Sequence, residues 1–411
     1  MSTRETEPVV FNPFEPGFLD DPYQQYARLR EHEPVHRAPM GGWVLTRYAD
    51  IWGILRDQRV SSAEIVGDVE REMLLRAMGI WEAWNESVLP ELANATMLTM
   101  DPPEHSRVRG LVNKAFTPKA VDRLRSHIQD LVDELLTSAT VEETVDVVRA
   151  LAEPLPALVI CELLGVPESD RPELQRLSHA GIVLIEPVID ADQLRSGDAA
   201  LRRLIEYFEA LVAERRRRPE HDLLTALATA EMDGQRLDDQ ELAVNAILLF
   251  AAGHETTTNL IGTGTLALLE HPDELAKLRA DPSLVPNAVE ELLRYESPVQ
   301  FTGRRAVEPI EIGGQEIAAN ERIIPVLGAG NRDPDRYADP DRLDVERADI
   351  HPLTFGGGIH FCVGAALARA EAQVAFGALL RTFPDLSLAG EPVRRPSFTL
   401  RGLASLPVTG H

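Results

Sequence analysis

The chain has 411 residues, of which 66 are acidic and 41 are basic, so its net charge is −25. This excess of negative charge argues against nucleic acid or an anionic membrane as a partner of the whole molecule. The longest apolar run, Ala246 to Gly253, is much shorter than the ~20 residues that span a bilayer, and the first residues lack the apolar core of a signal peptide. We therefore expect a cytoplasmic protein.

The length would allow two or three domains, but no Gly/Ser linker, charge block, low-complexity segment or internal repeat divides the chain. We expect a single domain over residues 1–411. Helical patterns dominate it, so the expected fold class is mainly α with a small β-rich part. We also expect the protein to be a monomer.

The first β-rich part is predicted near the N-terminus. Residues 35–46 favour two short strands around Gly41-Gly42, and a helix follows from residue 48. A second hairpin is expected to turn at Gly313-Gly314. Between them, residues 61–100 carry large apolar side chains such as Met73 and Trp81, and these belong either to the core or to the wall of a ligand pocket.

A helix is predicted after Pro102-Pro103, because proline fits the first turn of a helix. His105 and Arg109 are four residues apart in it and therefore share one face. The spacing alone leaves two readings open: a solvated helix face, or a site for an anion.

A long central helix is predicted from the N-cap Asp238 to His271. Gly253 and three consecutive threonines, 256–258, interrupt its otherwise strong helix formers, and a local rule broken in a strong element indicates function or strain. The hydroxyl of Thr256 can bond to the carbonyl of Ala252 and bend the helix. Glu255 is either a carboxylate in an apolar neighbourhood or a solvent-facing residue at a kink.

Two further stretches carry charged pairs. Glu291 and Arg294 are three residues apart in a helix predicted for residues 285–296. If this pair were exposed, it would carry no information about function. Arg304 and Arg305 lie in a predicted strand and point to opposite faces of it, so only one of them can face a given ligand.

The residues around Cys362 form the most informative stretch of the chain. Three glycines, 356–358, precede the cysteine and allow backbone to approach a flat ligand, and strong helix formers follow from Ala365. A cysteine at a helix start is near unpaired N–H groups, which favour the thiolate. Zinc is not expected, because Cys161 is the only other cysteine. Cys161 itself is either a buried core thiol or, less simply, a ligand.

The segment from Phe355 to Arg369 reads FGGGIHFCVGAALAR and resembles the haem-thiolate loop of the cytochrome P450 family, FGxGxHxCxG, at every fixed position. AGHETT around Glu255 resembles the acid and alcohol pair of that family, and ExxR at Glu291 resembles its structural pair. The motifs occur in the family's order and extend from about Asn12 to the C-terminus. The resemblance implies the cytochrome P450 fold.

The resemblance also implies a role for each of the residues above. Cys362 would be the axial ligand of haem b, and Glu255 and Thr256 would manage proton delivery during oxygen activation. Glu291 and Arg294 would form a structural triad with Arg342. The residues implied to contact the haem or its propionates are His105, Arg109, Ala252, Arg304, Phe355, His360 and Gly364.

The implied activity is insertion of one oxygen atom from O2 into a hydrophobic small molecule, as a hydroxylation or an epoxidation. No flavin or iron–sulfur motif occurs in the chain, so electrons are expected from a ferredoxin and an NAD(P)H-dependent ferredoxin reductase. Basic residues that could attract an acidic ferredoxin, or simply be solvated, are Arg107, Lys114, Lys119, Arg123 and Arg125. Apolar candidates for the pocket wall are Leu248, Leu249, Ala252, Val299, Phe301 and Leu403. Two alternatives stay open: a haem-thiolate peroxygenase, decarboxylase or aryl-coupling enzyme, and a non-catalytic haem sensor.

Overall fold

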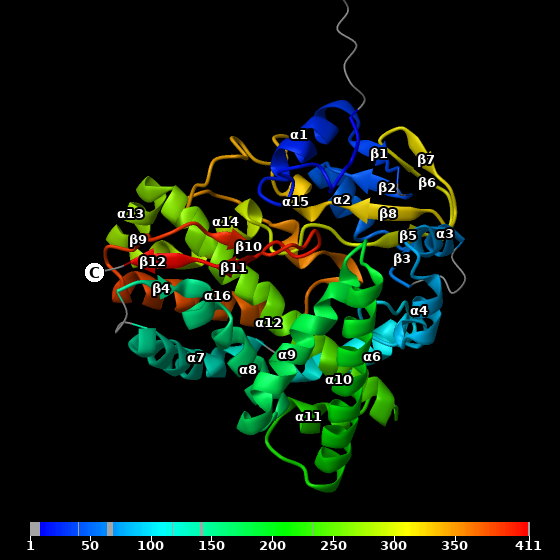
Figure 1. Cartoon of the computed structure of the whole chain (residues 1–411), viewed down its shortest axis with the longest axis horizontal. Coiled ribbons are helices and arrows are strands. Elements are labelled where there is room, and N and C mark those ends of the chain that lie inside the picture. Colours follow the sequence, from blue (N-terminus) through cyan, green and yellow to red (C-terminus); the bar gives the residue numbers. More distant parts are fainter. Residues whose placement is uncertain are drawn as a thin grey trace, which may run out of the picture.

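The computed structural model describes residues 9–39, 41–63, 69–116, 118–139, 143–232 and 234–409. Its central element is α12 (Asp239–Glu270), which crosses the middle of the molecule (Figure 1). At about 1.5 Å per residue the helix is roughly 48 Å long. It begins at a capping box: the Asp238 carboxylate accepts a hydrogen bond from the Glu241 amide, and the Glu241 side chain accepts one from the Asp238 amide. The predicted start of this helix is confirmed.

Four long helices pack directly on α12. Almost the whole circumference of α12 is buried, which explains why its sequence is apolar on all sides instead of amphipathic. These four helices are α8 (Pro154–Leu164), α10 (Ala191–Arg217), α14 (Val285–Tyr295) and α16 (Ala365–Thr382).

The other α-helices surround this centre. They are α1 (Tyr23–His32), α2 (Tyr48–Ile54), α3 (Val69–Ala77), α4 (Trp81–Glu86), α5 (Leu89–Leu92), α6 (Glu104–Ala115), α7 (Pro118–Ala139), α9 (Arg171–Ile182), α11 (Leu223–Thr229), α13 (Pro272–Ala280) and α15 (Leu327–Gly330).

The largest sheet has five strands in the order β1-β2-β8-β5-β3 and lies beside α1 and α2 (Figure 1). Only the pairing of β2 with β8 is parallel. Its strands are β1 (Val35–Arg37), β2 (Trp43–Leu45), β3 (Val60–Ser61), β5 (Arg304–Ala306) and β8 (Arg322–Pro325). Both predicted strands around Gly41-Gly42 are confirmed.

Three smaller sheets complete the β-rich part. The hairpin predicted at Gly313-Gly314 is formed by β6 (Ile310–Ile312) and β7 (Gln315–Ile317), and both glycines have positive φ. In the second, β12 (Pro407–Thr409) lies between β4 (Val145–Asp146) and β9 (Ser387–Leu388), and the third pairs β10 (Val393–Arg394) with β11 (Leu403–Ser405). The mainly α fold class is thus confirmed.

Residues 69–100 form a satellite of the core. Trp81 and Trp84 are partly buried against Ile80 and against Ile189 of the segment before α10, whereas Met73 is 65% exposed. The two tryptophans of this segment therefore pack against the core, whereas Met73 does not. Residues 64–68 lie outside the described part.

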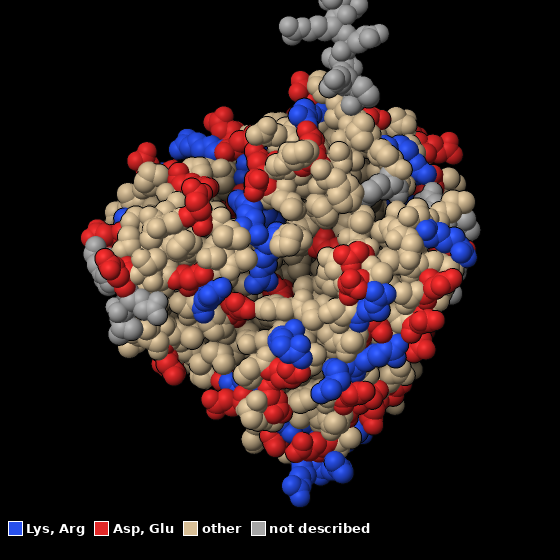
Figure 2. All heavy atoms as spheres, in the orientation of Figure 1, with Lys and Arg blue, Asp and Glu red and all other residues tan. Residues whose placement is uncertain are grey.

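The face of the molecule shown in Figure 2 carries acidic and basic side chains mixed together, with a hollow near its centre. Among the described residues, no helix is long and apolar enough to cross a membrane.

Candidate active site

Cys362 lies between a tight loop and the first turn of α16. Its amide donates to the carbonyl of Phe355 at 2.9 Å, and the helix begins at Ala365 with Gly364 as its N-cap. The side chain of Cys362 is accessible, whereas Cys161 is fully buried. This confirms the predicted position of Cys362 at a helix start, and Cys161 is a core thiol.

Two opposing effects act on the Cys362 sulfur. Desolvation by the surrounding protein atoms raises the pKa of the thiol, whereas backbone N–H groups of Gly364 and Ala365 and the charge of Arg109 lower it. The N–H groups at the helix start therefore favour the thiolate, as expected, but desolvation is the larger effect. A metal cation at the sulfur would reverse the balance, because coordination deprotonates a thiol.

The glycines of the loop serve two different purposes. Gly358 has a φ of 63°, and a Cβ there would collide with the carbonyl oxygen of Leu55 at the end of α2. A Cβ on Gly364 would meet no other residue within 4 Å. The three glycines therefore allow the loop to lie close to α2, whereas the loop is open at Gly364.

Four basic groups gather from three elements around this loop. The rings of His105, on α6, and His360 are 4.3 Å apart between centroids. Arg109, also on α6, donates to the carbonyl of Phe361 at 2.6 Å. Arg304, on β5, donates at 2.6 Å to the carbonyl of the neighbouring Gly303. Helix α6 and strand β5 therefore bring together residues about 200 positions apart.

Among the described residues, none of these four basic groups forms an ion pair with a carboxylate, although Asp101 acts on some of them from a distance. His105 is 2% exposed, and neither of its ring nitrogens has a hydrogen-bond partner in the described structure. Burial lowers the pKa of His360 to about 4, with the charges of His105 and Arg304 acting in the same direction. Burial also lowers the pKa of Arg304 to about 10, with Asp101 opposing it. A buried imidazole without a partner among basic groups fits an anionic ligand, and the two carboxylates of haem b are such a ligand.

Arg305 takes a separate set of partners. Its guanidinium donates to Asn320 at 3.1 Å and contacts Ser61 at 3.4 Å. The separation of the two neighbouring arginines agrees with the expectation that they point to opposite faces of the strand.

The middle of α12 contains an opening in an otherwise buried helix. Ala252 is exposed and Thr256, four residues later, is half-buried, so both lie on the same accessible face. The Thr256 hydroxyl donates to the Ala252 carbonyl at 2.8 Å, as predicted from the sequence. A hydroxyl and a small side chain on that face leave room for a ligand.

Glu255 lies on a different face of α12 and is only 1% exposed. Its carboxylate is 3.1 Å from Nε2 of His179 on α9, 3.3 Å from Nε2 of His254, and 2.8 Å from the guanidinium of Arg395. Burial raises the pKa of Glu255, but these two histidines outweigh it and hold the pKa well below its usual range. The reading in which Glu255 faces solvent is therefore wrong.

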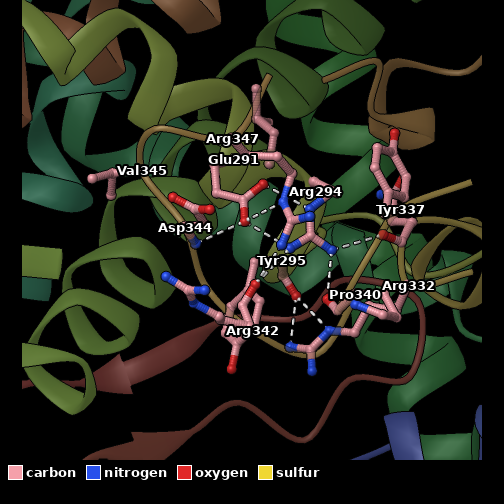
Figure 3. A network of polar contacts seen from close by, with 12 residues as sticks. Glu291, Arg294, Tyr295, Arg332, Tyr337, Pro340, Arg342, Asp344, Val345 and Arg347 are labelled. Carbon is pink, nitrogen blue, oxygen red and sulfur yellow. Dashed lines mark hydrogen bonds and ion pairs between the residues drawn. The ribbon is translucent and has the colours of Figure 1, made fainter. Parts of the chain in front are cut away.

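Glu291 and Arg294 of α14 are both fully buried and bonded twice, with two N–O distances of 2.7 Å (Figure 3). Arg294 also donates to the carbonyls of Asn331 and Pro340, at 3.0 and 2.7 Å. The pair therefore ties α14 to the segment that precedes the cysteine loop, instead of lying exposed on a helix.

The third member of this network is Arg347, not Arg342. Arg347 donates to Glu291 at 3.1 Å, and its side chain is 10% exposed. The Arg342 side chain is 60% exposed and reaches only Glu274, at 4.0 Å. Arg342 contributes its carbonyl, which accepts from Arg294 and Arg347. The sequence-based assignment of Arg342 is wrong because the chain turns between the two arginines.

Two other expectations change. Arg107 forms an ion pair with Glu241 of α12, and Lys114 donates to the carbonyl of Glu231 at 2.6 Å, so both basic groups are engaged within the protein. Leu249 and Leu403 are 5% and 1% exposed and belong to the core, whereas Leu248, Val299 and Phe301 are partly buried. The residues that remain candidates for the pocket wall are thus Leu248, Val299, Phe301 and Ala252.

Comparison with known proteins agrees with this geometry. A family model described as cytochrome P450 matches residues 82–408. Cytochrome P450 107B1 of Saccharopolyspora erythraea is 42% identical, covering 99% of both chains. Cytochrome P450 monooxygenase PikC of Streptomyces venezuelae is 41% identical, covering 95% of this chain and 91% of the relative.

Solved structures agree as well. P450BioI, in complex with an acyl carrier protein ligated to hexadec-9Z-enoic acid, superposes with a TM-score of 0.88 at 36% identity, covering 96% of this chain and 99% of that chain. The chain belongs to the cytochrome P450 family. It is a monooxygenase of the bacterial type, and haem is the cofactor of its family.

Proposed function

We propose that the protein binds haem b through Cys362 and inserts one oxygen atom of O2 into a hydrophobic small molecule, by hydroxylation or epoxidation. The observation that carries this proposal is the set of four basic groups around the cysteine loop, two of which are histidines, His105 being buried and His360 partly buried. These four groups can compensate the charge of a planar ligand with two carboxylates that lies against the loop.

Within this proposal each residue has a task. His105, Arg109, Arg304 and His360 hold the two carboxylates of the haem, and the Sγ of Cys362 ligates its iron. Ala252, Phe355 and Gly364 leave space for the flat ring. When bound, the haem supplies activation of dioxygen, which no amino-acid side chain provides.

Glu255 and Thr256 handle protons. Thr256 presents its hydroxyl on the accessible face of α12, where it can orient a proton donor close to the reacting oxygen. Glu255 is buried, but His179 beside it is half-exposed and bridges it to the surface. Protons then pass from solvent to His179, to Glu255 and on toward Thr256.

The electrons are proposed to come from a ferredoxin and its NAD(P)H-dependent reductase. Helix α6 contacts the cysteine loop through Arg109 and ends near Lys114, whose exposed amine is held by the Glu231 carbonyl. A positive end of α6 beside the loop would attract an acidic carrier.

The substrate is proposed to be apolar and of medium size. Leu248, Val299 and Phe301 supply apolar surface to the pocket wall. An apolar substrate needs no acidic partner there. Two relatives are named for such compounds: the 6-deoxyerythronolide B hydroxylase of Saccharopolyspora erythraea is 41% identical, and the vitamin D(3) 25-hydroxylase of Pseudonocardia autotrophica is 38% identical.

An isotope experiment tests this function. Haem-loaded protein is supplied with a ferredoxin, its reductase, NADPH and 18O2, and candidate substrates are chosen by the change in the haem spectrum on binding. We expect a product that carries one 18O atom. Binding without NADPH oxidation would favour the sensor alternative, and a product formed only with hydrogen peroxide would favour the peroxygenase alternative.

A further inference from the structure

We propose that His179, His254 and Glu255 form a binding site for one divalent transition metal ion, with Zn2+ as the best match. The site would join α9 to α12 on the side of the central helix away from Thr256. It contains none of the residues proposed to hold the haem, but it shares Glu255 with the proposed proton path, and the proposed reaction does not require the ion.

Two of the three separations between the ligand atoms match a zinc site. One oxygen, Oε1 of Glu255, lies 3.1 Å from Nε2 of His179 and 3.3 Å from Nε2 of His254, and the three atoms lie within 4.8 Å of one another. Zinc bonds to nitrogen and oxygen are about 2.0–2.1 Å, which makes the edge of a zinc tetrahedron about 3.3 Å. Binding of an ion would bring the two histidine nitrogens to this separation.

The orientation of His254 suits a metal ligand. Its Nδ1 is 2.8 Å from the carbonyl oxygen of Phe250, which can only accept, so Nδ1 carries a hydrogen and donates it there. Nε2 is then the ring nitrogen that faces Glu255. A histidine whose other nitrogen donates to a backbone carbonyl is the usual arrangement of a zinc ligand.

Two buried atoms of this cluster have no hydrogen-bond partner among the described residues. They are Nε2 of His254 and Oε1 of Glu255, and both residues are 1% exposed. Nε2 of His254 and Oε1 of Glu255 lie 3.3 Å apart and face each other in this buried place. A metal ion between them would satisfy both atoms.

The surroundings supply a second carboxylate beside His179 and an access path. Oε1 of Glu153, just before α8, is 3.4 Å from Nε2 of His179, and both side chains are about one-third exposed. Arg395 donates to Oε2 of Glu255 at 2.8 Å, which fixes the carboxylate with Oε1 toward the histidines. Glu153 and Glu255 thus place two carboxylates beside His179, which favours a cation there.

An ion at this site would have two effects. It would hold α9 against α12, and it would withhold the Glu255 carboxylate from proton transfer. The second effect rests on the proposed function, whereas binding of the ion does not.

Isothermal titration of haem-loaded, tag-free protein with ZnCl2 at neutral pH tests the proposal. We expect one zinc ion per chain, and a loss of affinity of at least about tenfold in His179→Gln and in His254→Gln. His127→Gln is the matched control, because it removes another histidine paired with a glutamate but without a second histidine, and it should bind zinc as the wild type does.

A crystal soaked in ZnCl2 gives a second readout that does not depend on the variants. The anomalous difference map at the zinc edge should show its peak between His179, His254 and Glu255. Absence of binding, equal affinity in all three variants, or a peak only at surface carboxylates would overturn the proposal. If zinc binds at the site but leaves turnover unchanged, the metal site stands and the role of Glu255 in proton transfer fails.

Discussion

Arg294 and Glu291 form a doubly hydrogen-bonded ion pair in which both side chains are completely buried. Removing one partner of a buried pair leaves the other charge unpaired and costs about 3–5 kcal/mol. We expect Arg294→Met to lower the free energy of unfolding by about this amount, measured by denaturant unfolding of the purified protein.

The same network predicts different effects for its two outer arginines. Arg347→Ala removes a donor from Glu291 and should also be strongly destabilising, whereas Arg342→Ala leaves the Arg342 carbonyl in place and should change stability by less than about 0.5 kcal/mol. The opposite ranking of these two variants would contradict the structure.

Glu371 of α16 is 2% exposed, and its Oε2 has no hydrogen-bond partner in the described part of the chain. Burial raises the pKa of this carboxyl to about 8. Since the pKa is raised in the folded state, the unfolded chain loses the proton first as pH rises, and stability falls between about pH 4.5 and pH 8.

Glu371→Gln removes this dependence. The free energy of unfolding of the variant, minus that of the wild type, should rise with pH across that window by up to about 1.4 kcal/mol per pH unit. Glu206→Gln, at a 73% exposed side chain, is the control and should give a flat difference. A flat difference for Glu371→Gln as well would mean that the carboxyl is already ionised.

Thr256 is expected to couple electron use to product formation. Thr256→Ala removes the hydroxyl that bonds Ala252, so we expect NADPH oxidation to continue while product per NADPH falls at least about tenfold and hydrogen peroxide accumulates. Thr256→Ser keeps a hydroxyl and should retain most of the coupling. Equal coupling in the alanine and serine variants would exclude a role for the hydroxyl.

Glu186, in the segment between α9 and α10, fastens that segment to the C-terminal part of the chain. Its carboxylate accepts from the amides of Phe398 and Thr399, at 3.0 and 3.3 Å, and from the hydroxyl of Ser397. We expect Glu186→Ala to accelerate both association and dissociation of a bulky azole inhibitor several-fold, as followed by stopped-flow absorbance.

The control for that experiment lies on α9 itself. Glu173 is half-exposed and pairs with Arg176 one turn later, so Glu173→Ala should leave both rates unchanged. Similar rates in the Glu186 variant and the wild type would show that this contact does not limit access to the site.

Local sequence rules were sufficient wherever the relevant partners are close in the chain. Asp238 and Glu241 form the predicted helix start, and Thr256 forms the predicted bond to Ala252, because both are contacts within one turn. The order of motifs was sufficient for the family as well.

The same rules failed where partners come from distant segments. The surroundings of Glu255 include His179 and Arg395, which are 76 and 140 positions away and carry no motif of their own. The sequence does not distinguish Arg347 from Arg342 as the third member of the Glu291–Arg294 network. The turn between the two arginines decides which side chain reaches Glu291. For Cys362 the helix start indicated the N–H groups that favour the thiolate, but the opposing desolvation of the sulfur cannot be read from a helix start.

The account depends most on Cys362 as a haem ligand. The most direct test is the absorption difference spectrum of the reduced, haem-loaded protein with carbon monoxide, measured on wild type, Cys362→Ala and, as the control, Cys161→Ala. We predict the strongly red-shifted Soret band of a thiolate ligand in wild type and Cys161→Ala, and its loss in Cys362→Ala. Absence of that band in wild type, or its persistence in Cys362→Ala, would contradict the account.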